Sequence, residues 1–333
     1  MNSVSRKAPS FSPPVLVLFG PTASGKTALL EGLFAGPRPL CRAEVISADS
    51  MQVYRGMDIG TAKPGPELRR RLPHHLIDIR NPDEPFNAGD FVRLAGAAAG
   101  DIIRRGAEEG RFILPVVSGG TGFYLAAFIR GLPESPPSDR GVREALRAEL
   151  ARKGAAALMD ELARLDPVSA RNIHVNDRYR LLRALEVCRM SGRPLSSFAQ
   201  NGRPGDYRFL IVEIRRNRED LYRNINQRCG EMFRRGLPEE VRGLHEKGYT
   251  PDDPGLRAIG YREFFVESPG TDRPWTLSAD TEGVKALVAR NSRRYAKRQE
   301  TFFASLPETA RIDGSGAGAL DLLGSLVHTF LKS

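Results

Sequence analysis

The chain has 333 residues, of which 41% are apolar and 27% charged, with a formal charge of +10 and a pI near 9.8. This composition is typical of a globular protein with one large domain and a smaller appended one, and no apolar run approaches the roughly 20 residues of a membrane span. A nucleic-acid-binding protein needs such an excess of positive charge, whereas a kinase of small metabolites does not. A basic surface that only serves solubility is an alternative explanation that stays open.

The beginning of the chain and its cysteines indicate a cytoplasmic protein. Residues 1–14 are polar and contain proline, and the apolar stretch after them is only five residues long, so a signal peptide is not expected. Cys41, Cys188 and Cys229 lack metal-type spacing, which predicts reduced thiols and no zinc site. We expect no membrane partner.

Short apolar runs alternate with helical patterns, which predicts a parallel sheet built from strand-helix-strand units. Strands are expected at residues 15–19, 43–47, 75–79, 112–117 and 209–214. Helices are expected near residues 28–33, 88–105 and 123–128, and the chain beyond 214 is expected to be mainly helical, with turns at 251–254 and 268–274.

The regular alternation stops between residues 131 and 205, where the pattern is helical and rich in arginine. Turn-forming sequences open it at 131–137 and close it at 201–205, so we interpret it as an inserted helical domain. The expected organisation is a flexible N-terminus at 1–13, a core at 14–131 and 206–310, a helical insertion at 132–205, and a C-terminal tail or helix at 311–333.

A phosphate-binding loop follows the first expected strand. It reads Gly-Pro-Thr-Ala-Ser-Gly-Lys-Thr and precedes a helix-prone segment. Its glycines let successive N–H groups point at an anion, and the following helix adds its positive end. The fold class is therefore α/β, a P-loop NTPase-like parallel sheet flanked by helices with a helical insertion. Lys26 is expected to reach the terminal phosphates and Thr27 to hold Mg²⁺. The predicted binding residues are Gly20, Pro21, Thr22, Ala23, Ser24, Gly25, Lys26 and Thr27.

Two further segments follow expected strands. Asp49 ends the run Glu-Val-Ile-Ser-Ala-Asp and should lie beside the phosphate loop, because the carboxyl ends of parallel strands face the ligand crevice. It could hold magnesium, act as a general base or only cap a helix, and the chain lacks the switch element that a nucleotide hydrolase needs. The glycine turn at 118–122 would let a substrate approach Thr121, but a structural turn explains it equally well.

Basic residues gather in two segments. One covers residues 171–180 and Arg183 in the insertion, and the other recurs at helical spacing with interleaved aromatic residues between 290 and 303. A solvated basic face is the usual explanation of such a helix. Two such segments in a protein of this pI favour a track for RNA phosphates.

The motifs together resemble the tRNA dimethylallyltransferase family, also called tRNA isopentenyltransferases. The similarity includes Pro-His-His-Leu-Ile-Asp at 73–78 and Gly-Leu-Pro-Glu-Glu-Val at 236–241. It runs in order, without large gaps, from about residue 15 to 303. The other segments that carry it are 20–27, 46–64, 119–124, 173–186, 258–263 and 295–299.

The resemblance implies transfer of a dimethylallyl group from dimethylallyl diphosphate to N6 of adenosine 37, beside the anticodon of tRNA. The phosphate loop would hold the leaving diphosphate, with Lys26 and Mg²⁺ at Thr27 stabilising its charge. By the same resemblance Asp49 is the base that accepts the N6 proton, and Arg228 joins the diphosphate clamp. The chain departs from the commoner pattern at Cys229 and Gly230, which replace a valine and an aspartate, and at Phe123, which replaces a leucine.

The implied partner is the anticodon stem-loop of tRNA, whose adenosine would turn out into a protein channel, and we expect a monomer. Two alternatives stay open, namely prenyl transfer to free AMP, ADP or ATP, and a P-loop small-molecule kinase or RNA-binding NTPase. The arginine-rich insertion argues against a free nucleotide. The predicted tRNA contacts are Asp49, Ser50, Met51, Gln52, Thr121, His174, Asn176, Asp177, Arg178, Arg180, Arg257, Gly260, Tyr261, Arg262, Lys297, Arg298 and Gln299.

Overall fold

The computed structural model describes residues 12–198, 205–268, 274–306, 310–316 and 318–333. The chain divides into two compact units, one formed by Met1–Ile129 with Pro204–Ser333 and the other by Arg130–Arg203. Most of the N-terminus expected to be flexible, and most of the turn at 201–205, lie outside the described residues. In the part of the chain that is described, no helix has the length and apolar character to cross a bilayer.

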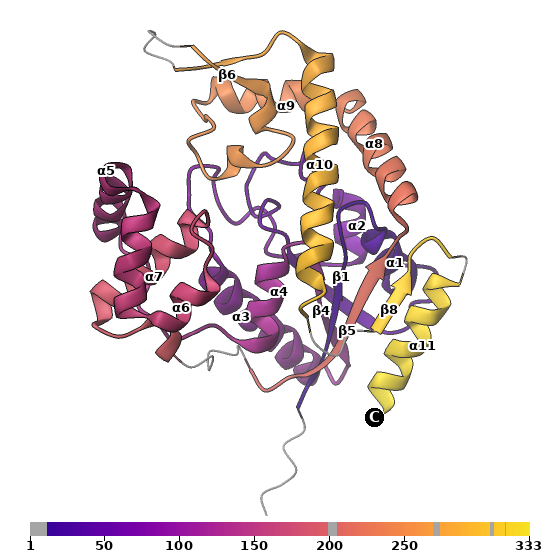
Figure 1. Ribbon diagram of the computed structural model, residues 1–333. Helices are drawn as coiled ribbons and strands as arrows, with labels where there is room; N and C mark the ends of the chain where they lie inside the picture. Colours follow the sequence, from indigo (N-terminus) through magenta and orange to yellow (C-terminus); the bar gives the residue numbers. More distant parts are fainter. Residues whose placement is uncertain (1–11, 199–204, 269–273, 307–309, 317) are drawn as a thin grey trace, which may run out of the picture. The chain divides into compact units, whose positions relative to one another are not determined.

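The first unit is built on a six-stranded parallel sheet with the order β3-β2-β4-β1-β5-β8 (Figure 1). The strands are β1 (Pro14–Phe19), β2 (Arg42–Ala48), β3 (His74–His75), β4 (Ile113–Gly119), β5 (Arg208–Arg215) and β8 (Ala310–Asp313). The residues of β1 and β4 are buried throughout, as is typical of central parallel strands covered on both faces. The expected α/β class and four of the five expected strands are confirmed.

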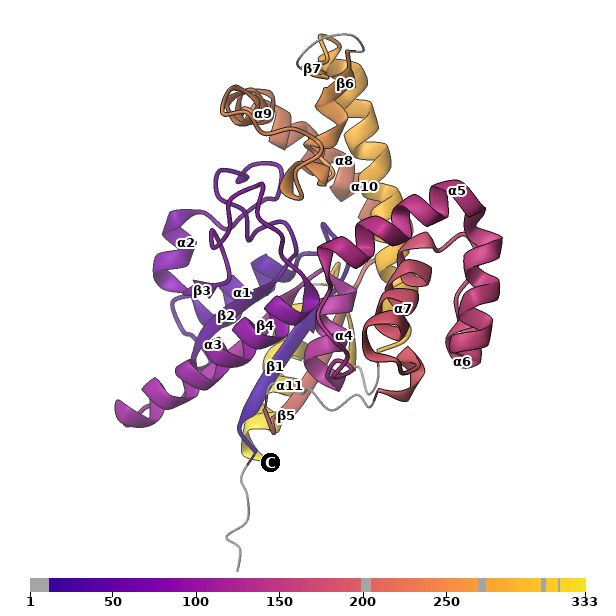
Figure 2. The ribbon, with the colours of Figure 1, turned by 90° about the vertical axis from the view of Figure 1, so that its left-hand side faces the viewer.

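Helices cover both faces of this sheet (Figures 1 and 2). On one face, Leu16 and Leu18 pack in a common core with α1 (Lys26–Phe34) and α11 (Ala319–Lys332). On the other face lie α3 (Ala88–Glu108) and α4 (Gly122–Arg130), where Phe128 contacts Phe209 with ring centroids 5.9 Å apart. The alternation of side chains along each strand separates these two cores.

A further core of the first unit lies beyond the carboxyl ends of the strands. Val53, Tyr54 and Met57 from the segment after β2 pack there with helical and short-strand elements from the C-terminal half. These elements are α8 (Arg218–Arg234), α9 (Leu237–Glu246), η2 (Gly255–Arg257), η3 (Arg262–Phe264), β6 (Phe265–Glu267), β7 (Trp275–Leu277) and α10 (Thr281–Phe303). Figure 2 shows the segment after β2 and α2 (Pro66–Arg71) on the side of the sheet that faces α8 and α9.

The second unit is helical and, in its described residues, contains no strand. It consists of α5 (Arg140–Leu165), α6 (Pro167–Asn172), α7 (Arg178–Ser191) and η1 (Leu195–Ser197). Glu186 is fully buried, accepts hydrogen bonds from Ser138 Oγ at 2.7 Å and Asp139 N at 2.8 Å, and forms ion pairs with Arg143 and Arg183. Arg183, expected in a basic RNA track, therefore stabilises the interior of this unit.

Two expectations about the sheet are wrong. The strand expected at 75–79 ends at His75, because Leu76 and Asp78 adopt positive φ values of 62° and 57° that extended backbone does not allow. The C-terminal segment is more than a tail or helix, since β8 pairs with β5 as the sixth strand. Arg311 and Asp313 alternate with Ala310 and Ile312 in this strand, as is common at a sheet edge.

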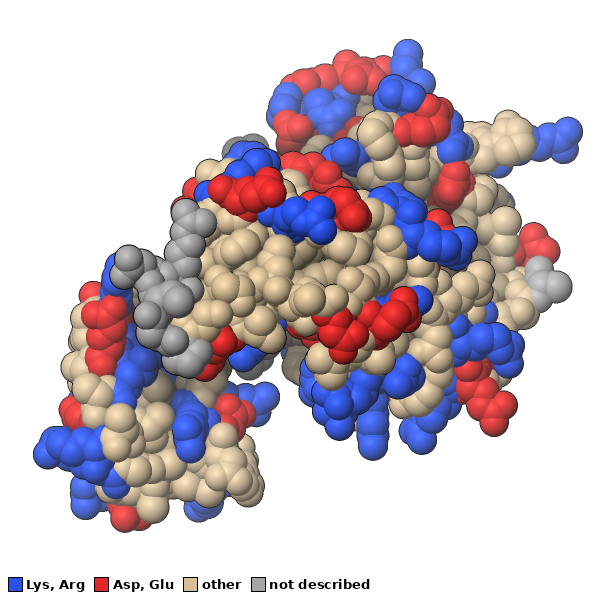
Figure 3. Space-filling view, turned by 90° about the horizontal axis from the view of Figure 1, so that it is seen from above, with Lys and Arg blue, Asp and Glu red and all other residues tan. Residues whose placement is uncertain are grey.

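The excess of positive charge does not form a single patch on the face drawn in Figure 3. There, Lys and Arg side chains are interspersed with Asp and Glu side chains. Several arginines of the described residues are held in ion pairs, among them Arg105 with Glu44 and Arg189 with Glu149 and Glu161. On this face, the basic residues that a polyanion could contact are therefore small groups rather than one continuous surface.

Candidate active site

Three strands bring the expected catalytic segments to one edge of the sheet. In the strand register, Gly119 is opposite both Phe19 and Ala48, so Gly20, Asp49 and Gly120 leave the sheet side by side. A Cβ on Gly119 would lie 2.1 Å from the carbonyl oxygen of Ala48, which explains a glycine at this position by packing. The expectation that Asp49 lies near the phosphate loop is confirmed, because both line one cavity of about 400 Å³.

The phosphate loop has the curled backbone that its sequence predicts. Ala23 and Gly25 have φ values of 62° and 100°, and Ser24 N donates to Pro21 O at 3.2 Å. Helix α1 begins directly after Gly25 without a side-chain cap, so the N–H groups of its first turn remain available to an anion. Thr27, in this first turn, is exposed and lines the cavity.

Lys26 is folded back onto the loop. Its Nζ donates to the carbonyl oxygens of Gly20 and Pro21 at 2.8 and 2.9 Å. Burial and, to a smaller extent, the charge of Arg228 lower the pKa of Lys26 to about 7, although the carboxylate of Asp49 opposes the shift. An arriving phosphate would therefore find a lysine whose ammonium form is poorly compensated by its surroundings.

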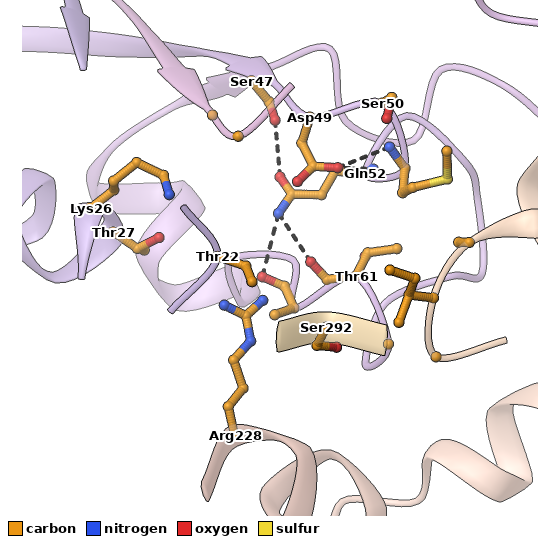
Figure 4. Close-up of a pocket in the computed structure, with 18 of the residues that line it drawn as sticks. Thr22, Lys26, Thr27, Ser47, Asp49, Ser50, Gln52, Thr61, Arg228 and Ser292 are labelled. Carbon is orange, nitrogen blue, oxygen red and sulfur yellow. Dashed lines mark hydrogen bonds between the residues drawn. The ribbon is translucent and has the colours of Figure 1, made fainter. Parts of the chain in front are cut away.

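Arg228 and Asp49 face the cavity from different elements. Arg228 extends from α8 (Figure 4), and burial lowers the pKa of its guanidinium while Asp49 raises it. Asp49 Oδ1 accepts from Met51 N at 2.9 Å and Gln52 N at 3.3 Å. Within the described residues Oδ2 has no hydrogen-bond partner. One oxygen of Asp49 thus holds a turn, while the other is available to a ligand.

Gln299 connects α10 to two of the strand ends. Its Oε1 accepts from Thr22 N at 3.0 Å, and its Nε2 donates to Gly120 O at 2.7 Å. The side chain is only 5% exposed, and a Cβ on Gly120 would come within 2.4 Å of its Nε2. Gln299, expected to contact tRNA, therefore uses its amide inside the protein, and the glycine turn is at least partly structural.

Sequence reasoning missed several residues that line the cavity. Tyr295 is one turn before Gln299 on α10, and burial and the charge of Asp49 raise its pKa to about 12, while Thr121 and Gln299 oppose this. Ser47 Oγ donates to Gln52 Oε1 at 2.9 Å, and Gln52 Nε2 donates to Thr61 O at 3.2 Å (Figure 4). Ser47 could have been found from its spacing of two residues from Asp49, because alternate strand residues share a face.

The other predicted tRNA contacts of the first unit occupy different environments. Ser50 N donates to Thr121 Oγ1 at 3.0 Å, and Met51, Arg257, Gly260 and Arg298 line the cavity. Arg262 and Lys297 are exposed but do not line it. Tyr261 is fully buried and donates to Glu240 Oε1 at 2.6 Å, so its side chain is not available for direct contact with RNA.

The predicted contacts of the second unit lie around the start of α7. His174, Asn176, Arg178 and Arg180 are exposed. Asp177 caps the helix by accepting from Arg180 N at 3.1 Å, and it also pairs with the guanidinium of Arg180. The role of Asp177 is therefore explained locally, whereas Arg178 and the nearby exposed Tyr179 present charge and an aromatic ring to solvent.

A phosphate loop between the first strand of a parallel sheet and its helix places the protein among the P-loop α/β enzymes. Comparison with known proteins narrows the class, since residues 52–306 match the IPP transferase family. The chain is 46% identical over 295 residues to the tRNA dimethylallyltransferase of Geobacter sulfurreducens, covering 88% of this chain and 89% of that protein. It therefore belongs to the IPP transferase family.

Two further relatives agree with this assignment. The chain is 42% identical over 320 residues to tRNA dimethylallyltransferase 1 of Syntrophotalea carbinolica, covering 95% of this chain and 96% of that protein. The crystal structure of the tRNA isopentenylpyrophosphate transferase from Bacillus halodurans is similar with a TM-score of 0.63 and 34% identity, over 96% of this chain and 97% of that one.

Proposed function

We propose that this chain transfers a dimethylallyl group from dimethylallyl diphosphate to N6 of the adenosine beside the anticodon of tRNA. Membership of the IPP transferase family and the relatives named tRNA dimethylallyltransferase support this function. The observation that carries it is one cavity lined by the phosphate loop, by Lys26 and Arg228, and by Asp49, whose Oδ2 accepts no hydrogen bond from the described residues. We propose that the enzyme acts as a monomer in the cytoplasm.

The cationic side of the cavity suits a leaving diphosphate. The C–O bond between the allyl carbon and the diphosphate breaks, and its electron pair leaves on the diphosphate oxygen. N–H groups of the phosphate loop, Lys26 and Arg228 stabilise this growing charge most strongly where water is excluded. Lys26 has to exchange the carbonyl oxygens of Gly20 and Pro21 for phosphate oxygens, which compensates its charge better.

The start of α1 fits a magnesium ion. Mg²⁺ usually takes only one or two protein ligands and completes its shell with water and substrate phosphates, and the exposed Thr27 hydroxyl offers such a ligand. No group of three or more His, Cys, Asp or Glu side chains that could hold a metal occurs in the described ranges. Bound at Thr27, Mg²⁺ would neutralise part of the diphosphate charge.

Asp49 is the proposed base for the adenine. The N6 amine is a weak nucleophile because its lone pair is delocalised into the ring, so it has to lose a proton as the N–C bond forms. Oδ2 of Asp49 can accept this proton while Oδ1 stays bonded to the turn. Tyr295, whose high pKa keeps it protonated, lies near Asp49 without competing for the proton.

The tRNA contacts that we propose are the exposed or cavity-lining residues of the predicted set. In the helical unit these contacts are Arg178 and Arg180. In the first unit they are Arg257, Lys297 and Arg298. Basic side chains of this kind bind the phosphate backbone without reading the sequence. Tyr261 and Gln299 are left out as direct contacts because both side chains are buried.

The molecule that accepts the prenyl group distinguishes the proposed function from its alternatives. The protein is incubated with Mg²⁺, radiolabelled dimethylallyl diphosphate and either unmodified tRNA or AMP, and the digested nucleosides are separated. We expect N6-dimethylallyladenosine from tRNA and no labelled AMP. Label in AMP alone would identify an adenylate isopentenyltransferase. In a parallel incubation that also contains ATP, consumption of ATP without prenyl transfer would identify a kinase or NTPase.

A further inference from the structure

Glu240 in the motif at 236–241 is a carboxylate with an unusually complete set of donors. Its Oε2 accepts from the backbone N–H groups of Asp58 and Ile59 at 3.0 and 2.8 Å. Its Oε1 accepts from Gly60 N at 3.2 Å and from Tyr261 Oη at 2.6 Å. Three successive N–H groups that point at one anion form a backbone nest. Here the anion is a side chain of α9, 182 residues after Asp58 in the sequence.

The donors around Glu240 need an acceptor at both of its side-chain oxygens. Burial raises the pKa of Tyr261 well above its ordinary value, and the charge of Glu240 adds to the rise, so the phenol stays protonated and donates. A carboxylate can accept hydrogen bonds at both oxygens. A side-chain amide would place its own NH₂ group against some of these donors. Gly60 also packs closely on the Tyr261 ring, since an added Cβ would lie 2.5 Å from it.

Hydrogen bonds continue from this anchor to Asp49. Gln52 Nε2 donates to the carbonyl oxygens of Thr61 and Ala62 at 3.2 and 3.5 Å, directly after the anchored residues. The Gln52 backbone N–H donates to Asp49 Oδ1 at 3.3 Å. Figure 4 shows Thr61, Gln52 and Asp49 on one side of the cavity. The wall formed by Gly60, Thr61 and Ala62 and the orientation of Asp49 thus depend on one connected set of bonds.

We propose that Glu240 is a positioning residue that, by anchoring residues 58–60, holds Gln52 and with it the carboxylate of Asp49 in the orientation that turnover requires. This inference rests on the proposed role of Asp49 as base. The motif at 236–241 would then act on the site through Glu240, although Glu240 does not itself line the cavity.

The test compares Glu240→Gln and Glu240→Ala with the matched control Glu239→Gln, which removes an exposed carboxylate next to Glu240 on the same helix. We expect kcat to fall about tenfold in Glu240→Gln, which keeps one oxygen acceptor, and about 10²-fold in Glu240→Ala, as for other small misplacements of a catalytic group. The KM for dimethylallyl diphosphate should stay unchanged, because the phosphate loop and Arg228 are outside this set of bonds. Glu239→Gln should behave like the unaltered protein.

Amide hydrogen exchange supplies a measurement that does not depend on activity. The N–H groups of residues 58–60 should be protected in the unaltered protein and exchange faster in both Glu240 variants, with the remaining peptides unchanged. A kcat within about twofold of the unaltered protein in folded Glu240→Ala, a loss confined to the KM for dimethylallyl diphosphate, or an equal loss in Glu239→Gln would overturn the inference. If the unaltered protein does not prenylate tRNA, the proposed function fails, whereas the exchange result still tests the anchor.

Discussion

At the scale of single residues, Lys26, Arg228 and Asp49 influence one another in the site before any ligand binds. Burial lowers the pKa of both Lys26 and Arg228, and Asp49 is the group that opposes this at each of them. A diphosphate adds negative charge beside both cations. The site therefore binds an anion partly because its own charges are insufficiently compensated.

Asp49→Asn separates the two tasks of this side chain. Asparagine keeps an oxygen that can accept from Met51 N and Gln52 N, but it cannot accept the N6 proton. We expect turnover to fall by at least ~10²-fold, the scale of a lost general base, while the affinity for tRNA stays near normal. Single-turnover prenylation and a tRNA binding titration measure the two effects, and near-normal turnover would remove Asp49 from the mechanism.

The lowered pKa of Lys26 predicts that diphosphate affinity depends on pH. In the free enzyme Lys26 loses its proton as the pH rises through about 7, whereas a bound diphosphate raises this pKa. Binding above pH 7 therefore takes up a proton, and the affinity is highest below the free pKa and falls by up to about tenfold per pH unit above it. Calorimetry in buffers of different ionisation enthalpy measures the proton uptake. Its absence at pH 8, or its persistence in Lys26→Met, would contradict the assignment.

At the scale of elements, residues from α8 and α10 complete a site that begins at the phosphate loop. Arg228 comes from α8, whereas Tyr295 and Gln299 come from α10. The two helices pack against each other and enclose, with Tyr54 and Met57, the core beyond the strand ends. The sheet supplies the backbone groups of the site, and these helices supply the side chains that fix them.

Gln299→Leu tests this connection by removing both hydrogen bonds at constant helix propensity. Thr22 N and Gly120 O would lose their partner in a buried place, so the free energy of unfolding should fall by about 1–3 kcal/mol. Urea denaturation measures the change. Glu300→Gln, at the next position of α10, is the control and should leave stability unchanged, and an equally stable Gln299→Leu would show that the connection is dispensable.

The sequence predicted those parts that depend on local pattern. The strands β1, β2, β4 and β5 are apolar runs, and Asp49 follows from the rule that ligands meet the carboxyl ends of parallel strands. The bond between Thr22 and Gln299 joins residues 277 positions apart, and no local pattern indicates it. The same holds for Glu240 and the N–H groups of residues 58–60. β8 was missed because this short edge strand alternates charged and apolar residues. A strand was wrongly expected at 75–79 because Leu76 is apolar, although its backbone is left-handed.

At the scale of the whole molecule, the net charge of +10 does not say which basic side chains are free, because many of them form ion pairs with carboxylates. Of the basic residues expected to bind RNA, Arg183 is held by Glu186 and Arg180 pairs with Asp177. Arg178, Lys297 and Arg298 are exposed. Net charge therefore indicates a class of partner, whereas the phosphate contacts depend on a few free side chains.

The salt dependence of tRNA binding tests these contacts. The logarithm of the binding constant should fall steeply with the logarithm of salt concentration, and Arg178→Ala should lower the slope by about 1, for the one phosphate contact that is lost. Arg140→Ala is the control, because this exposed arginine of the same unit is paired with Glu144. A flat salt dependence, or an equal change in the control, would contradict the proposed contacts with RNA phosphates.

The bond between Thr22 and Gln299 also has a consequence for the synthesis of the chain. The phosphate loop leaves the ribosome among the first residues, but the amide that tethers it follows 277 residues later. The edge strand β8 and helix α11 emerge later still. Contacts of such high sequence separation form late, because the intervening chain has to be ordered first. During synthesis the phosphate loop is therefore present long before the residue that holds it in place. The loop can reach its final conformation only when nearly the whole chain has been made.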